Sequence, residues 1–408
     1  MSTNAIRAVE DAARSSYGRL LALLVSRSRD VAAAEDALGD AFLNALTHWP
    51  RDGVPSNPDA WLVAAAQRRL IDGDRRAAVR TRVEPDLTYA ASLMHEAGEG
   101  NALPDRRLGL MLACAHPAID ATIRTPLMLQ VVLGLDATLI AGAFLTAPTA
   151  MAQRLVRAKQ KIRDAGIPFD VPSADELPAR LDAVLEAIYA AFGTGWDAVD
   201  GSDPARADLT AEALFLGRLV VELLPPAASA EARGLLALML YCVARASARR
   251  GPAGEYVPLS AHDVSRWNHQ QLGEAESLLQ SAAQLQNPGR FQLEAAIQSA
   301  HLGAALGRPA SPLVIVALYD ALLAFAPTVG VLVNRAAAIA VASGAAAGLA
   351  AADAIPATVV AEYQPWWALR AHLLSELARD DEARQARARA AGLTQDPAIR
   401  AFLLRDER

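Results

Sequence analysis

The residues best suited to chemistry lie on a basic segment near the middle of the chain. Between positions 149 and 163 there are five basic residues and no acidic one. Lysine and arginine on one face of a helix can displace counterions from phosphates, and Arg and Gln side chains reach base edges in a major groove. This face therefore predicts nucleic-acid binding. Its contact residues are expected to be Thr149, Gln153, Arg154, Arg157 and Lys161.

The same segment has the layout of a helix-turn-helix. An apolar stripe of helical spacing runs along the other face of the basic helix. A shorter helix with Leu139, Ala143 and Phe144 on one side precedes it, and Pro148 separates the two because proline disfavours a helix interior. A basic helix after a tight turn is typical of a DNA reader. Taken alone, the second helix is also compatible with an ordinary solvated amphipathic helix.

A second basic cluster lies earlier in the chain. Six arginines against two aspartates fall between positions 68 and 82. The cluster ends a predicted helix in which Asn57 is the N-cap and Pro58 the first residue, a favoured start. An earlier helix begins after another predicted cap, Asp30. Two local basic patches predict two separate nucleic-acid contacts.

Composition sets the class of the protein. The chain has 408 residues, of which 53% are hydrophobic, and alternating strand patterns are nearly absent, so the fold class is expected to be all-α. No apolar run is long enough for a transmembrane helix, and the first residues do not resemble a secretion signal. The two cysteines lie far apart, which predicts no disulfide framework. We therefore expect a cytoplasmic protein without membrane contact.

Charge is distributed unevenly. Up to Asp170 there are 20 basic and 19 acidic residues, whereas the remainder has 19 basic and 26 acidic residues. The acidic C-terminal part is thus a poor candidate for DNA binding.

Other chemical patterns are weak. The segment with His262, Asp263 and Ser265 holds the residue types of a hydrolase triad, but a helix-capping junction explains it better because triads assemble from separate elements. Cys114 and His116 lack a second ligand pair, so a helix-end turn is expected there in place of a metal site. We expect no catalytic residues, no metal, no cofactor and no enzymatic activity.

The helical segments resemble those of bacterial extracytoplasmic-function (ECF) sigma factors. The resemblance rests on AAEDALGDAFLNAL (33–46), NPDAWLVAAAQRRLID (57–72) and MAQRLVRAKQKIRDAGIPF (151–169). The resemblance extends over nearly the whole chain. Within the ECF sigma factors, the chain most resembles the subgroup with a long C-terminal extension that ends in tetratricopeptide-like repeats. The resemblance implies two small helical sigma domains, the second with a helix-turn-helix, and a helical extension. The implied segments are sigma region 2 (1–80), a polar linker (81–103), sigma region 4 (104–170) and the extension (171–408), with repeats from about 312.

The resemblance also implies roles for matching residues. The proposed partners are core RNA polymerase, promoter DNA, and a protein or peptide bound by the extension. Polymerase contact falls on an amphipathic helix with Asp36, Asp40, Phe42 and Leu46. Contact with the minus-thirty-five promoter element falls on the basic helix described above. Contact with the minus-ten element falls on Ser56, Asn57, Trp61, Gln67, Arg68, Arg69, Arg75 and Arg76.

One feature departs from the family pattern. Asp72, Gly73 and Asp74 interrupt the basic helix that contacts the minus-ten element. Glycine weakens a helix by about 1 kcal/mol relative to alanine, and carboxylates oppose phosphate binding. The sequence therefore predicts weak or conditional strand contact there.

Three functions follow from these patterns. The first is a sigma factor that directs promoter-specific initiation and carries a C-terminal regulatory or sensing domain that packs against the sigma domains. The alternatives are a helix-turn-helix regulator that acts without polymerase, and a tetratricopeptide-type scaffold that has lost sigma activity.

Overall fold

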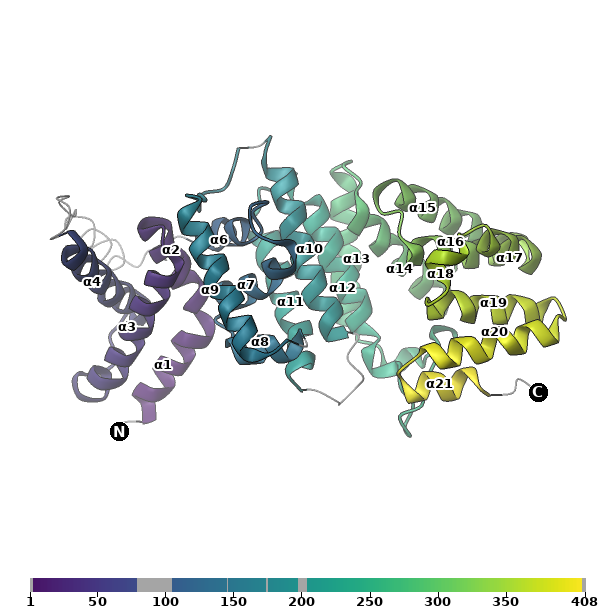
Figure 1. Ribbon diagram of the computed structural model, residues 1–408, viewed down its shortest axis with the longest axis horizontal. Coiled ribbons are helices and arrows are strands. Elements are labelled where there is room, and N and C mark those ends of the chain that lie inside the picture. The colour runs from purple at the N-terminus through teal and green to yellow at the C-terminus, as the bar shows by residue number, and fades with distance from the viewer. Residues whose placement is uncertain (1–2, 79–104, 145, 174, 197–203, 406–408) are drawn as a thin grey trace. The chain divides into compact units, whose positions relative to one another are not determined.

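The computed structural model describes residues 3–78, 105–144, 146–173, 175–196 and 204–405 (Figure 1). Within these ranges the regular structure is helical, apart from one isolated antiparallel bridge between Arg250 and Tyr256. The predicted all-α class is confirmed. The chain forms two compact units, Met1–Leu223 and Leu224–Arg408, which are described separately below.

The N-terminal unit begins with four helices that pack on one another. They are α1 (Thr3–Ser15), α2 (Tyr17–Ser28), α3 (Val31–Asp52) and α4 (Pro58–Ala78). The predicted caps are confirmed: the Asp30 carboxylate accepts the Ala33 N–H at 3.1 Å, and Asn57 Oδ1 accepts the Ala60 N–H at 3.1 Å. These caps satisfy backbone donors that a helix N-terminus leaves open, and so fix where α3 and α4 start.

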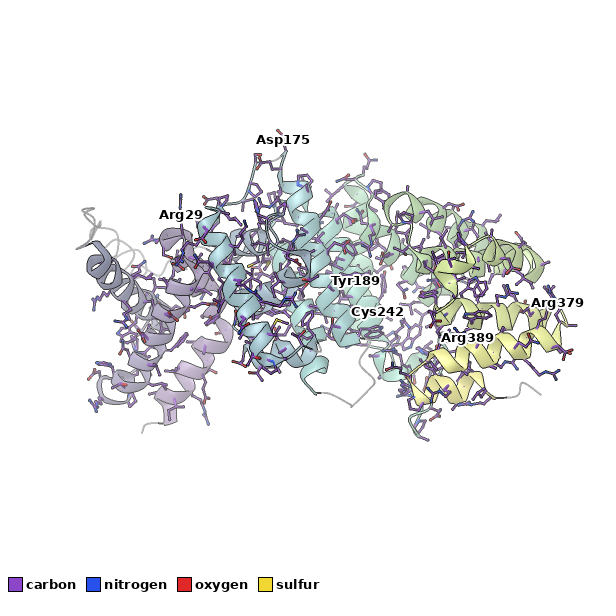
Figure 2. All side chains as sticks on the ribbon, in the orientation of Figure 1. Arg29, Asp175, Tyr189, Cys242, Arg379 and Arg389 are labelled. Carbon is purple, nitrogen blue, oxygen red and sulfur yellow. The ribbon has the colours of Figure 1, made fainter. Side chains whose placement is uncertain are left out.

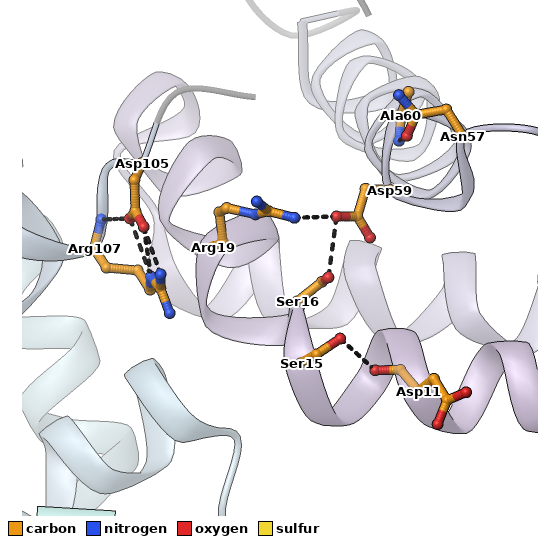
Figure 3. A network of polar contacts seen from close by, with 9 residues as sticks. All are labelled: Asp11, Ser15, Ser16, Arg19, Asn57, Asp59, Ala60, Asp105 and Arg107. Atoms are coloured by element: carbon orange, nitrogen blue, oxygen red, sulfur yellow. Dashed lines mark hydrogen bonds and ion pairs between the residues drawn. The ribbon is translucent and has the colours of Figure 1, made fainter. Parts of the chain in front are cut away.

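A polar network fixes the start of α4 against α2 (Figure 3). The Arg19 guanidinium donates to Asp59, and the Ser16 hydroxyl donates to the same carboxylate oxygen at 3.0 Å. Asp59 lies in the first turn of α4, where a negative charge is favoured by the helix dipole. The network therefore sets the orientation of α4, which carries most of the residues expected to contact the minus-ten element.

Six further helices of the N-terminal unit lie within the described residues. They are α6 (Arg107–Cys114), α7 (Ala121–Leu133), α8 (Ala137–Ala143), α9 (Pro148–Asp164), α10 (Leu177–Trp196) and α11 (Pro204–Leu223). Helix α2 packs against both α6 and α7. At the crossing with α7, a Cβ on Gly18 would lie 1.9 Å from the Val132 carbonyl oxygen, so only glycine permits this approach. Gly134 ends α7 with φ +72°, beside the Tyr17 ring. The first four helices and α6–α9 thus share one core.

Helix α10 belongs to this unit by its contacts. Thr125 Oγ1 on α7 donates to the Ala187 carbonyl at 3.1 Å, and an Arg180 guanidinium N–H donates to the Leu112 carbonyl at 2.8 Å. The boundary between the two compact units therefore falls after Leu223, and the start of the C-terminal extension at 171 stays a prediction from the resemblance. The sequence of α10 has an apolar face, which includes Leu181 and Ile188, but no charge pattern that distinguishes α10 from the later helices.

The C-terminal unit is a succession of helices that pack mainly on near neighbours. Short 3-10 turns η1 (Pro226–Ala228), η2 (Ala246–Ala248), η3 (Leu259–Ala261) and η4 (Val264–Arg266) interrupt its first part. Its α-helices are α12 (Ala230–Ala244), α13 (His269–Gln284), α14 (Arg290–Ala305), α15 (Pro312–Phe325), α16 (Val329–Ser343), α17 (Ala345–Asp353), α18 (Ala357–Val360), α19 (Gln364–Glu376), α20 (Asp380–Leu393) and α21 (Pro397–Leu403).

Helix pairs occur where the sequence predicts repeats. Helix α15 packs on α16, and α19 packs on α20, with Arg379 at the turn between α19 and α20 and Arg389 on α20 (Figure 2). Trp366 is buried in a cluster with Val333 and Ile355. That these pairs are tetratricopeptide repeats stays a prediction.

No single helix in the described ranges is long and apolar enough to cross a membrane. One bent pair, α8 with α9, reaches that length and composition jointly.

Candidate nucleic-acid interface

Helices α8 and α9 form the predicted helix-turn-helix segment. Asp136 caps α8 by accepting the Thr138 N–H at 2.7 Å, and Pro148 occupies the first turn of α9. The two helix axes bend by 112°, within the range of about 90–120° found for such motifs. The local sequence thus produces the two-helix geometry that can present α9 to a groove.

The two faces of α9 separate as the pattern predicts. Met151, Leu155, Ala158 and Ile162 are buried, which confirms the apolar stripe. On the other side, Thr149, Gln153, Arg157 and Lys161 are exposed, and Arg154 is half-buried because its guanidinium donates to Thr122 Oγ1 at 2.6 Å. The five expected contact residues for the minus-thirty-five element therefore lie on one helix and face away from its core.

A pocket of about 360 Å³ opens between α9 and the start of α7. Arg154, Arg157 and Lys161 line one side, and Ile119 and Ile123 line the other. A hollow with three cations and an apolar wall suits an anion such as a backbone phosphate.

Among the described residues that line this pocket, the one carboxylate has another function. Asp120 caps α7 by accepting the Thr122 hydroxyl at 2.6 Å and the Thr122 N–H at 2.8 Å. These hydrogen bonds hold the pKa of Asp120 below its usual value. The carboxylate is therefore committed to the helix start, and the pocket keeps a positive balance.

The residues expected at the minus-ten element have mixed environments. Ser56 is exposed, Asn57 is occupied as a cap, and half-buried Trp61 packs edge-on against Trp49 at 5.5 Å between ring centroids. Gln67 is buried, 7% exposed, and its Nε2 has no hydrogen-bond partner among the described residues. Contact between Gln67 and a DNA strand would therefore need a rearrangement of α4.

The arginines of α4 also differ in their surroundings. Arg68 is exposed, whereas Arg69 pairs with Asp40 on α3 at 2.6 Å. Arg75 and Arg76 belong to α4, but their side chains, like those of Asp72 and Asp74, lie outside the described residues.

The expected polymerase surface lies along α3. Asp36 is exposed, while Asp40, Phe42 and Leu46 are half-buried. Sequence reasoning missed Leu43, which is 63% exposed. Its spacing of seven residues from Asp36 and three from Asp40 puts all three on one helical stripe, a signal that could have found it.

Sequence reasoning also missed two cations on α9 that face the protein. Lys159 pairs with Glu35 of α3 at 2.5 Å, and Arg163 pairs with Asp30 at 2.8 Å. Lysine and arginine also form the exposed face of α9, so residue type alone does not show that Lys159 and Arg163 face the protein.

The candidate hydrolase and metal residues have structural roles. Ser265 Oγ donates to Asp263, which caps η4, and His262 Nε2 lies 3.2 Å from the Val257 carbonyl oxygen; this is a capping junction and lacks a serine–histidine contact. Helix α6 ends at Cys114, and His116 Nδ1 accepts the Ala118 N–H at 3.0 Å in the turn that follows. Both interpretations as local turns are confirmed.

Comparison with known proteins agrees with the N-terminal geometry. Residues 13–80 match the model for sigma-70 region 2, and residues 180–283 match a family of unknown function, DUF6596. An uncharacterized protein of Rhizobium meliloti (strain 1021) is 36% identical over 380 residues, which cover 92% of this chain and 89% of that protein. The chain belongs to the same family, a sigma factor family by its N-terminal domain. No solved structure matches.

The region 2 match assigns α2, α3 and α4 to a sigma domain. Sigma-70 proteins act in transcription by RNA polymerase and are initiation factors, not enzymes. The second match begins inside α10 and ends in α13, so it includes helices of both compact units. The ECF subgroup and the tetratricopeptide-like extension stay predictions.

Proposed function

We propose that this protein is an ECF-type sigma factor that binds core RNA polymerase and directs initiation at promoters with paired minus-ten and minus-thirty-five elements. The observation that carries the proposal is the combination, in one chain, of a region 2 domain and a helix-turn-helix segment whose Arg157 and Lys161 face solvent. Neither part alone accounts for both basic patches.

Each surface has a role in this proposal. Asp36 and Asp40, together with Leu43, offer an acidic and apolar stripe to a basic groove on polymerase. Arg157 and Lys161 contact the minus-thirty-five duplex, with the pocket beside them holding a backbone phosphate. Helix α4 contacts the separated strand at the minus-ten element.

The C-terminal unit is proposed to regulate these surfaces and to bind a protein or peptide on its paired helices. The net acidity of the C-terminal part of the chain suits contact with basic partners. A truncation that tests this role should end at Leu223, because ending at 170 would remove α10 from the core of the N-terminal unit.

Binding of the purified full chain to core polymerase distinguishes a sigma factor from the two alternative functions. A sigma factor is expected to bind core polymerase, and Leu43→Lys should weaken that binding because it replaces an exposed apolar side chain with a cation that faces the proposed basic groove. Arg384→Glu, on an exposed ion pair of α20, serves as the matched surface control.

Binding to promoter duplex without polymerase is the second measurement. Tight operator-like binding by the chain alone, with no affinity for polymerase, would favour the regulator. Absence of both activities would favour the scaffold.

A further inference from the structure

The DNA-contacting helix α9 is joined to the polymerase-contacting helix α3 by a buried ion pair. Lys159 Nζ lies 2.5 Å from Glu35 Oε2, and the two side chains are only 11% and 16% exposed. Arg163 and Asp30 form a second pair at the more open edge, where the Arg163 side chain is 48% exposed. We call these two pairs the α3–α9 latch.

Several titratable groups surround the latch. Tyr17 and Cys114 neighbour the buried pair from α2 and α6, and Asp36 is a further carboxylate near Glu35. At the open edge, Asp164 Oδ1 lies 3.8 Å from Arg163 Nε. Burial raises the pKa of Glu35, the nearby Asp36 carboxylate adds to that rise, and the Lys159 ammonium opposes it. Each charge therefore depends on its partner for compensation, so the pair favours one relative placement of α3 and α9.

The latch leaves both functional faces open. Gln153, Arg157 and Lys161 point away from α3, and Asp36 remains exposed on α3. The contact therefore does not cover the DNA-contacting or polymerase-contacting residues. What it fixes is the separation between them.

That separation is too small for a promoter. Elements at minus ten and minus thirty-five lie about 25 base pairs apart, about 85 Å along a straight duplex at 34–36 Å per turn. Helices α4 and α9 both pack on α3, whose 22 residues span about 33 Å at 1.5 Å per residue. In this arrangement α4 and α9 cannot contact both elements at the same time.

We propose that the structure is a closed state of the protein, held by the α3–α9 latch together with the packing of α2 on α6 and α7, and that these contacts part when both promoter elements are engaged. This inference rests on the proposed function for its consequence in transcription. The latch provides charged groups that water can solvate once the helices separate. Opening moves α9 from α3 and moves α6 and α7 from α2, and it leaves each helix intact.

A distance measurement tests closure independently of transcription. Spin labels are attached at Asp52→Cys on α3 and Val156→Cys on α9, both exposed positions outside the latch. Cys114 is buried and burial raises the pKa of its thiol, so it resists labelling, and half-buried Cys242 is replaced by Ala. The free chain should give one short distance, and the complex with core polymerase and promoter should give a distance longer by tens of ångströms.

Charge variants test the latch itself. Lys159→Glu should lengthen the distance in the free chain, and the swap Glu35→Lys with Lys159→Glu should shorten it again. Because a buried like-charge pair can unfold the unit, Arg163→Glu at the exposed edge serves as a milder variant. Arg335→Glu breaks a comparable pair between α16 and α15 and should leave the distance unchanged.

Two results would overturn the inference: a long or broad distance in the free wild-type chain, or an unchanged short distance in a complex that makes transcript. In run-off transcription at limiting polymerase, Arg163→Glu should raise transcript yield several-fold and Arg335→Glu should not. If no variant gives any transcript, the proposed function fails, while the distances alone still decide whether the latch closes the chain.

Discussion

The two compact units are both helical but gain their stability differently. In the N-terminal unit, segments distant in sequence share a core: α2 packs on α6 and α7, and ion pairs join α3 to α9. In the C-terminal unit, most contacts join a helix to its near neighbours, as in stacked helical repeats. The unit with the proposed DNA-binding surfaces therefore depends on contacts between distant segments, whereas in the C-terminal unit we expect the loss of one contact to act locally.

The largest effect is expected at the α2–α7 crossing. Gly18→Val would drive a side chain into the Val132 carbonyl and should lower the unfolding free energy of the N-terminal unit by about 3 kcal/mol or more. Hydrogen exchange followed by mass spectrometry would show faster exchange throughout α2, α6 and α7.

The matched control is Gly39→Ala, on exposed α3 surface with no atom near the added Cβ. It should stabilise the same unit by about 0.5–1 kcal/mol. Equal behaviour of the two variants would contradict a shared core.

The next largest effect is expected at the buried pair of Lys159 and Glu35. Lys159→Met leaves the Glu35 carboxylate without its partner and should lower the unfolding free energy by about 2–3 kcal/mol. This value is at the lower edge for buried pairs because both side chains keep some contact with water. The double variant Glu35→Leu with Lys159→Met should cost less than Lys159→Met alone. Urea unfolding of the four chains of this cycle measures the difference; additive losses would argue against coupling.

In the C-terminal unit the comparable contact is local to α12 and α14. The Glu231 carboxylate accepts N–H groups of Phe291 at 2.9 Å and Gln292 at 3.2 Å at the start of α14. Glu231→Ala should cost about 2 kcal/mol, since hydrogen bonds to a charged group are lost. Exchange should quicken in α14 and α12 but not in α2 or α7. Faster exchange in the N-terminal unit as well would contradict the local character of this contact.

A smaller effect is expected from pH. Burial opposes ionisation of Asp396, but hydrogen bonds from Arg250 and from the Ala398 and Ile399 N–H groups hold its pKa below the usual value. A carboxyl with a lowered folded-state pKa stabilises the protein above its unfolded pKa of about 4, and the contribution is lost as pH falls through the lowered value.

Thermal unfolding of the full chain between pH 6 and 3 should therefore show a decline that is shallower in Asp396→Asn. Identical slopes for the two chains would contradict this assignment.

The smallest effect is expected at the surface. Arg384 and Asp381 form a pair whose side chains are 71% and 84% exposed. Arg384→Ala should change the unfolding free energy by less than about 0.5 kcal/mol, because exposed pairs are screened by water and salt. A loss comparable to that of Lys159→Met would mean that burial does not govern these pairs.

Much of the local structure could be predicted from sequence. Caps at Asp30 and Asn57 followed from side chains that accept backbone N–H groups, and the buried stripe of α9 followed from its helical period. These features depend on residues close together in the chain, where spacing alone carries the information.

The tertiary features could not be predicted in this way. Nothing in the residue types separates Lys159, which faces α3, from Lys161, which faces solvent, until the partner helix is placed. The burial of Gln67 and the assignment of α10 to the N-terminal unit likewise depend on segments distant in sequence. Long-range packing decides which members of a charged face are free to bind.

Run-off transcription with core RNA polymerase and a library of promoter fragments tests the central claim most directly. A sigma factor should give transcripts that require this chain and share paired upstream elements. Arg157→Ala should reduce these transcripts at least tenfold, since a lost base contact is worth about 1–3 kcal/mol and phosphate contact is lost with it. Failure of the wild-type chain to support any transcript, together with no binding to core polymerase, would contradict the central claim.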